Sequence, residues 1–122
     1  MIYRKGERVL VQGLTGKQGS FWAEKMAACG TQIIGGVNPK RAGETHLGLP
    51  VFASAKAAMS AAPYDIAVMF IPPAMAKDAA LDAIEAGARS LVILTEHIPA
   101  HDVLAIRDAA KTAGTSVIGP RF

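Results

Sequence analysis

Short apolar runs alternate with stretches of helical periodicity along the whole chain. The runs are rich in Val, Ile and Leu, which is typical of buried strands. They cover residues 8–12, 31–37, 65–71, 90–94 and 116–118. Between them, apolar residues recur three and four positions apart, which predicts helices. These helices are expected over residues 18–28, 54–62, 74–86 and 99–113.

The predicted helices carry start and stop signals at their ends. Ser54 is a typical N-cap, and Pro63 cannot continue a helix. Glycines follow the other helices as C-terminal stops, at positions 30, 87 and 114. Residues 38–48 are expected to form a polar loop, and residues 49–52 a short extended piece.

The alternation of strands and helices predicts an α/β fold. Strands that are apolar on both faces belong to parallel sheets covered on both sides. We therefore expect a Rossmann-like, doubly wound parallel sheet of about five strands, with helices on both faces. A mixed α+β sheet is the alternative. In doubly wound sheets, ligands bind beyond the carboxyl ends of the strands, which directs attention to the segments after Gln12, Val37, Ile71 and Leu94.

Composition narrows the class of protein. A chain of 122 residues fits one domain, here residues 1–122, and its single cysteine excludes an internal disulfide and a four-cysteine zinc site. A net charge of +3 is too weak to indicate nucleic-acid binding. No apolar run approaches the ~18 residues of a membrane span, and the start of the chain lacks the apolar segment of a signal peptide. These features predict a soluble cytoplasmic protein.

The expected core is aliphatic and rich in small residues, because aromatics make up only 6% of the chain and alanine is very common. Phe21, Trp22, Met26 and Cys29 lie at helical spacing in the first helix, and we expect them in this core.

The first strand-end loop is glycine-rich and opens a helix. It reads Gly13-Leu14-Thr15-Gly16-Lys17-Gln18-Gly19. Glycine lets the backbone approach a ligand, and the free N–H groups of the first helical turn attract anions. The G-x-x-G-x-x-G spacing only approximates the dinucleotide-binding fingerprint and is not a P-loop. The alternative is a turn that serves tight strand–helix packing.

The second strand-end loop is basic. An NAD site usually places an acidic residue there to hold the ribose hydroxyls. This chain instead carries Val37-Asn38-Pro39-Lys40-Arg41. Lys40 and Arg41 favour a phosphorylated ribose, as in NADP or coenzyme A (CoA). The alternative is a solvated basic loop. In the third loop, Pro72 and Pro73 after Ile71 form an apolar ledge, and in the fourth loop Thr95 and Glu96 after Leu94 add a hydroxyl and a carboxylate. The alternative is that both loops only end their strands.

Together these loops resemble one known family. The matching segments are the glycine loop, Gly35-Gly36-Val37-Asn38-Pro39, Thr45-His46-Leu47-Gly48-Leu49-Pro50-Val51-Phe52, Ile71-Pro72-Pro73-Ala74 and Thr95-Glu96-His97-Ile98-Pro99. They resemble the N-terminal CoA-binding domain of succinyl-CoA synthetase (succinate–CoA ligase) α subunits, from about residue 8 to residue 120. The segment from Thr45 to Phe52 is the most specific.

The resemblance implies a ligand, a partner and a set of contacts. The family makes an acyl-CoA from a carboxylic acid, CoA and a nucleoside triphosphate, as in the tricarboxylic acid cycle, and pairs with a nucleotide-binding β subunit. It implies CoA as the ligand and a β-subunit-like partner. A homo-oligomer is the alternative, and no metal, membrane or nucleic-acid partner is expected. The implied CoA-binding residues are Gly13, Thr15, Gly16, Lys17, Gln18, Gly19, Val37, Pro39, Lys40, Arg41, Ile71, Pro72, Leu94, Thr95 and Glu96.

The chain also departs from the family pattern. The family continues Gly-Pro-Asn-x-Pro-Gly where this chain has Gly119-Pro120-Arg121-Phe122, and His97 replaces a glycine. No histidine matches the phosphorylated one of the family's second domain, so the chain alone is expected to be inactive as a ligase. His46 is expected to be a structural hydrogen-bonding residue, and His101 to be exposed. An NADP-binding reductase domain and a free-standing CoA- or NAD(P)-sensing domain are the alternative functions.

Overall fold

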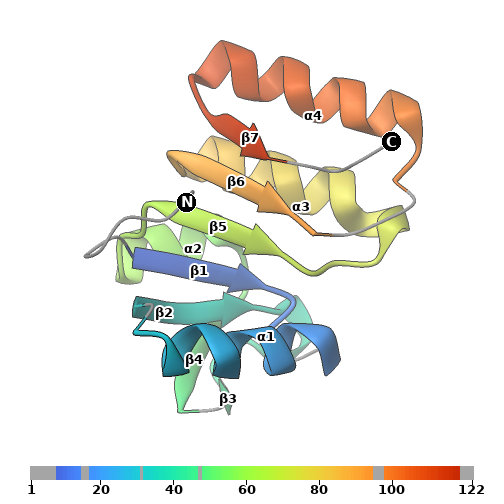
Figure 1. Cartoon of the computed structure of the whole chain (residues 1–122). Helices are drawn as coiled ribbons and strands as arrows, with labels where there is room; N and C mark the ends of the chain where they lie inside the picture. The colour runs from blue at the N-terminus through green and yellow to red at the C-terminus, as the bar shows by residue number, and fades with distance from the viewer. Residues whose placement is uncertain (1–7, 15–16, 31, 47, 95–97, 119–122) are drawn as a thin grey trace.

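The strands form one seven-stranded sheet in the computed structural model, which describes residues 8–14, 17–30, 32–46, 48–94 and 98–118 (Figure 1). The strand order is β3-β4-β2-β1-β5-β6-β7. All neighbouring strands are parallel except β3 and β4, which are antiparallel. Their bounds are β1 Arg8–Gln12, β2 Gln32–Val37, β3 Thr45–His46, β4 Leu49–Phe52, β5 Ile66–Met69, β6 Ser90–Ile93 and β7 Ser116–Ile118.

The predicted α/β class and doubly wound order are confirmed, with two short strands more than expected. β4 is the predicted extended piece, and β3 lies inside the segment predicted to be a loop. They add an edge beyond β2, where β4 pairs with β2 in parallel and β3 returns beside β4.

The helices begin and end close to the positions that the sequence predicts. Ser54 caps its helix by accepting a hydrogen bond from the Ala57 amide at 3.0 Å. Gly87 and Gly114 end two helices in the left-handed conformation, with φ of 98° and 78°. The bounds are α1 Lys17–Ala28, α2 Ala55–Ala61, α3 Pro73–Ala86 and α4 Ala100–Ala113, with a 3₁₀ turn, η1, over Pro39–Arg41.

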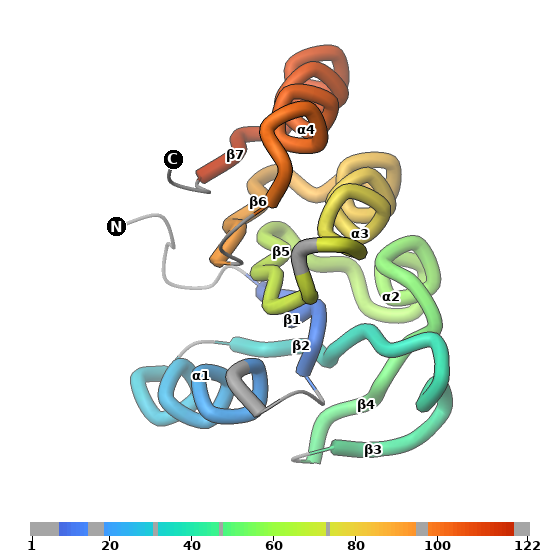
Figure 2. Tube along the Cα trace, turned by 90° about the vertical axis from the view of Figure 1, so that its right-hand side faces the viewer, coloured from blue at the N-terminus to red at the C-terminus, as the bar shows by residue number. Residues whose placement is uncertain are grey.

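The helices cover both faces of the sheet, as predicted. Figure 2 shows α1 on one side and α2, α3 and α4 side by side on the other. This distribution follows from right-handed crossovers, because the chain moves outward from β1 in one direction to β2 and in the other from β5 to β7. None of the helices described in the structure is long and apolar enough to cross a membrane.

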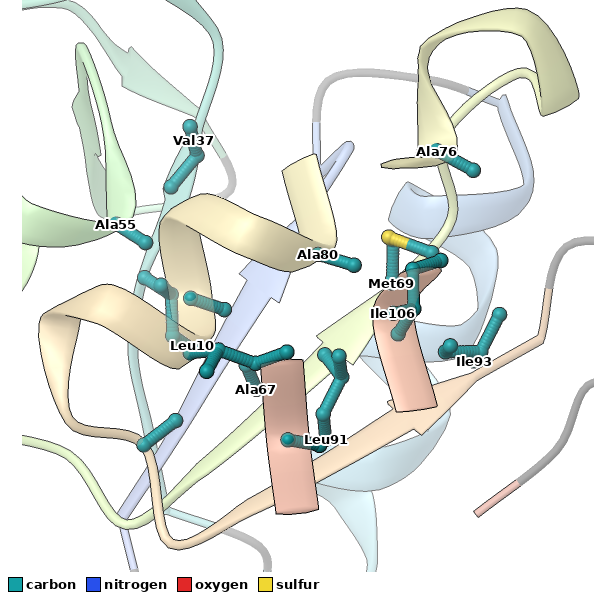
Figure 3. Close-up of a cluster of buried hydrophobic side chains, with 14 of the residues drawn as sticks. Leu10, Val37, Ala55, Ala67, Met69, Ala76, Ala80, Leu91, Ile93 and Ile106 are labelled. Carbon is teal, nitrogen blue, oxygen red and sulfur yellow. The ribbon is translucent and has the colours of Figure 1, made fainter. Parts of the chain in front are cut away.

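The larger core lies between the sheet and α2, α3 and α4 (Figure 3). Strands supply Leu10, Met69 and Leu91, whereas the helices supply mainly alanines such as Ala80. Small side chains let the helices approach the sheet closely, so the expected aliphatic, small-residue core is confirmed. Tyr64 is a buried aromatic residue of this cluster. Its hydroxyl donates to the Ala55 carbonyl at 3.1 Å, and burial raises its pKa.

The expectation that Phe21, Trp22 and Cys29 are core residues is wrong. Phe21 is 53% exposed, Trp22 is 46% exposed, and Cys29 is also exposed. Helix α1 rests on the sheet through Gly19 and Ala23, with Met26 partly buried beside them. These positions form a stripe of mostly small residues at helical spacing, so the two large aromatics lie outside it. They contact each other instead, with ring centroids 5.5 Å apart.

Candidate functional site

The carboxyl ends of the central strands lie next to one another along one side of the sheet, which we call the carboxyl edge. Gln12, the last residue of β1, is level with Val37 of β2 and with Met69 of β5. Met69 is in turn level with Ile93 of β6. These strands point the same way in Figure 1, and Figure 2 views the molecule from that end. The four loops predicted to form the site therefore start side by side.

Backbone hydrogen bonds join the starts of these loops. The Gly13 amide donates to the Val37 carbonyl at 3.4 Å. On the other side of β1, the Phe70 amide donates to the Gln12 carbonyl at 2.8 Å. The Leu94 amide donates to the Met69 carbonyl at 3.2 Å and continues the row. The edge is thus a connected backbone surface and not four independent loops.

Two glycines of the glycine loop, Gly13 and Gly19, pack directly against neighbouring backbone. Gly13 has a φ of 89°, and a Cβ atom there would overlap the Phe70 carbonyl oxygen. A Cβ at Gly19 would overlap the Gly13 carbonyl oxygen, so α1 starts in contact with the end of β1. Tight strand–helix packing is therefore a real role of these two glycines. It is compatible with ligand binding, because dinucleotide-binding turns use glycines for both purposes.

Leu14 anchors the loop from below. Its side chain is fully buried, and a Cβ atom at Gly36 of β2 would overlap it. Its carbonyl oxygen accepts a hydrogen bond from Ser20 Oγ of α1 at 2.8 Å. Ser20 Oγ also lies 2.7 Å from His46 Nε2 of β3. The predicted hydrogen-bonding role of His46 is confirmed, and its partner belongs to the helix that follows the glycine loop.

Gln12 is a buried polar residue directly below the glycine loop. Its side chain is 1% exposed, and its Nε2 donates to the Ala79 carbonyl of α3 at 2.8 Å. Within the described part of the chain, no group donates to its Oε1. Gln12 was not among the predicted site residues, although a single polar residue that ends an apolar strand is a visible signal in the sequence.

The basic loop after β2 is an ordered turn. Asn38 caps η1 by accepting a hydrogen bond from the Lys40 amide at 3.0 Å. The turn is tied to β4, because the Asn38 amide donates to the Phe52 carbonyl at 3.0 Å. Lys40 is exposed and Arg41 is half-buried. Arg41 Nε lies 3.4 Å from Glu44 Oε2, and an ion pair this exposed is weak enough to exchange with a stronger anion.

The third loop brings apolar groups next to the glycine loop. Ile71 Cδ1 would lie 3.4 Å from a Cβ atom at Gly13, so this side chain flanks the turn. Pro72 is exposed and directly precedes α3. Leu94, at the start of the fourth loop, is 51% exposed. Ile71, Pro72 and Leu94 therefore lie at the same edge as the glycine loop.

The structure places most, but not all, of the predicted site residues. Gly13, Gly19, Val37, Pro39, Lys40, Arg41, Ile71, Pro72 and Leu94 gather at the carboxyl edge, as their strand and loop positions show. Lys17 and Gln18 begin α1, and only their backbone is described. Thr15, Gly16, Thr95 and Glu96 lie outside the described residues, as does His97. His101 is exposed at the start of α4, as expected.

The electrostatics of the edge suit an anionic ligand. The first turns of α1 and α3 contain no acidic side chain, so the positive ends of both helices are not neutralised there. Lys40 and Arg41 add formal positive charge in the turn after β2, where Glu44 pairs with Arg41. No group of three or more potential metal ligands occurs within the described ranges.

Comparison with protein families gives one match, to the CoA binding domain, over residues 4–97. A succinate–CoA ligase [ADP-forming] subunit alpha 2 of Archaeoglobus fulgidus is 43% identical over 120 residues. An ADP-forming sulfoacetate-CoA ligase subunit, SauD, of Bilophila wadsworthia is 41% identical over 119 residues. Each alignment covers 98% of this chain but only 42% and 41% of the relative, so the chain spans about two fifths of their length.

Among solved structures, the fold is similar to part of an ATP citrate lyase from Methanothrix soehngenii in complex with citrate and coenzyme A. The TM-score is 0.79 at 20% identity, over 98% of this chain and 21% of that one. At this identity the likeness concerns the fold alone.

Proposed function

Because the chain belongs to the CoA binding domain family, we propose that it holds CoA by its nucleotide end at the carboxyl edge of the sheet. The observation that carries this proposal is the meeting of the glycine loop and the basic loop at that edge, joined by the hydrogen bond from Gly13 to Val37. A CoA nucleotide carries a diphosphate and a separate 3′-phosphate, so it needs two anion sites that are close but distinct.

The glycine loop is proposed to hold the diphosphate. Gly13 and Gly19 bring the end of β1 and the start of α1 together, and neither has a side chain that would keep the two apart. Backbone amides at a helix N-terminus are good donors to phosphate oxygens. Thr15, Gly16, Lys17 and Gln18 belong to this segment and are proposed to line the diphosphate.

The basic loop is proposed to hold the 3′-phosphate. Pro39 starts η1, and the cap at Asn38 fixes the turn that presents Lys40 and Arg41. The planar fork of Arg41 suits a phosphate, which would replace the exposed carboxylate of Glu44 as its partner.

The residues that follow β5 and β6 are proposed to flank the ligand. Ile71 and Pro72 after β5, with Leu94, Thr95 and Glu96 after β6, follow strands on the side of β1 away from the basic loop. Val37 lies below both loops and supports them from the core.

For the whole protein, we propose a part in an acyl-CoA ligase, with this chain as its CoA-binding domain and no ligase activity of the chain alone. The relatives are named as subunits of ligases, which supports a partner subunit that binds the nucleoside triphosphate. The names differ in the acid, succinate in one and sulfoacetate in the other. A role in the tricarboxylic acid cycle would require succinate as the acid.

Titration of the ¹⁵N-labelled chain with CoA tests where the ligand binds. Amide signals of Gly13, Asn38 and Phe70, at the carboxyl edge, are expected to shift strongly. Those of Asp65 and Gly87, at the opposite ends of the strands, are expected to stay in place and serve as the internal control. Shifts concentrated at the opposite edge would contradict the proposed site.

A further inference from the structure

Helix α1 and the edge strand β3 share one hydrogen-bonded contact, which we call the Ser20–His46 clasp. Ser20 Oγ lies 2.8 Å from the Leu14 carbonyl oxygen and 2.7 Å from His46 Nε2. The serine hydroxyl has one hydrogen, and the Leu14 carbonyl oxygen can only accept. The hydroxyl must therefore donate to Leu14, and His46 Nε2 must donate to the hydroxyl.

The clasp holds a peptide group at the entrance of the glycine loop. Leu14 is the last residue before the loop segment proposed to bind the diphosphate, and its side chain is immobilised against Gly36. Holding the Leu14 carbonyl therefore fixes the orientation of the chain at the point where it leaves Leu14 for this segment. A loop whose entrance is oriented in advance binds an anion at a lower cost in ordering.

The two glycines at the ends of the loop are held by backbone packing. Gly13 is held against Phe70 of the segment after β5, and Gly19 against Gly13. The Leu14 carbonyl is different, because in the described structure it is held by a side chain that depends on a second side chain. His46 in turn sits on a two-residue strand at the outer edge of the sheet. The orientation of the loop is thus coupled to β3 and β4.

We propose that Ser20 and His46 are positioning residues that orient the glycine loop for the diphosphate of CoA. This inference rests on the proposed function and adds two residues that need not touch the ligand. It also gives the short antiparallel strand β3 a role, which is to carry the histidine that completes the clasp.

The test measures binding of CoA and of dephospho-CoA, which lacks the 3′-phosphate, by isothermal titration. Ser20→Ala and His46→Ala are each expected to weaken both ligands about fivefold to tenfold, as for loss of one hydrogen bond. The ratio between the two ligands should stay at the wild-type value, since the basic loop is unchanged. The double variant should bind about as weakly as either single variant, because both changes break the same chain of hydrogen bonds.

Rescue and control variants separate positioning from general stability. Ser20→Thr keeps the hydroxyl and His46→Gln keeps an N–H donor of similar reach, so both should restore most of the affinity. Thr115→Val removes a comparable bond, from Thr115 Oγ1 to the Ala88 carbonyl at 3.1 Å, near the opposite edge. It should lower the melting temperature about as much as Ser20→Ala and His46→Ala do, and leave the affinity for CoA unchanged.

Three outcomes overturn the inference while the proposed function stands. They are wild-type affinity in Ser20→Ala and His46→Ala, a loss that Thr115→Val reproduces, and an NMR spectrum of His46 that shows Nε2 without a hydrogen at neutral pH. If the wild-type chain binds neither ligand, the proposed function is wrong and the inference falls with it.

Discussion

Replacing Gly13 by alanine is expected to remove about 2–5 kcal/mol from the free energy of unfolding. Two costs add at this position. A φ of 89° is unfavourable for a residue with a Cβ atom, by about 1–2 kcal/mol. The Cβ would also overlap the Phe70 carbonyl oxygen, and forcing apart such a close contact costs about 1–3 kcal/mol. Urea unfolding followed by circular dichroism measures the loss.

Gly87→Ala is the matched control for this variant. Gly87 has a similar φ of 98°, but a Cβ atom there would meet nothing within 4 Å. Its loss should therefore be limited to the conformational cost, about 1–2 kcal/mol. Equal losses in the two variants would show that the approach of the loop to Phe70 contributes nothing, and would contradict the packing that frames the proposed diphosphate site.

Replacing Arg41 by alanine is expected to weaken CoA binding about tenfold to a hundredfold, the range for loss of a hydrogen-bonded charge pair. Dephospho-CoA should bind to this variant nearly as well as to the wild type, because it lacks the 3′-phosphate assigned to Arg41. Isothermal titration with both ligands gives the comparison directly.

Two further variants complete the Arg41 experiment. Glu44→Gln removes the carboxylate 3.4 Å from Arg41 Nε and should tighten CoA binding about twofold, as expected for an exposed ion pair. Arg107→Ala changes an exposed arginine in α4 and should have no effect. If Arg41→Ala weakened both ligands equally, the assignment of the 3′-phosphate to the basic loop would be wrong.

Much of the fold could be predicted from local signals. The cap at Ser54 and the stops at Gly87 and Gly114 set helix ends that the structure reproduces. The meeting of the loops at one edge was also predictable, because parallel strands joined by helices must bring their carboxyl ends together. These features depend on residues near one another in the sequence or on the alternation of elements.

The exposure of Phe21 and Trp22 could not be predicted from helical spacing. Spacing shows which residues share a face but not which face meets the sheet. Gly19 and Ala23 form the contacting stripe because they let α1 lie close to β1 and β2, and this preference for small residues outweighs the preference for burying aromatics. The sequence signal was the pair of small residues four positions apart.

The Ser20–His46 clasp could not be predicted from the sequence either, for a different reason. Ser20 and His46 are 26 positions apart, and their contact depends on β3 folding back beside β4. A two-residue strand leaves almost no periodic signal. A hydrogen bond for His46 was therefore predictable, but its partner Ser20 was not.

The central claim is that the carboxyl edge binds the nucleotide end of CoA and not a nicotinamide dinucleotide. Isothermal titration of the chain with CoA and with NADPH tests it most directly. CoA is expected to bind with a dissociation constant in the micromolar range, and NADPH far more weakly. Millimolar or weaker binding of CoA together with tight binding of NADPH would contradict the claim and favour an NADP-binding domain.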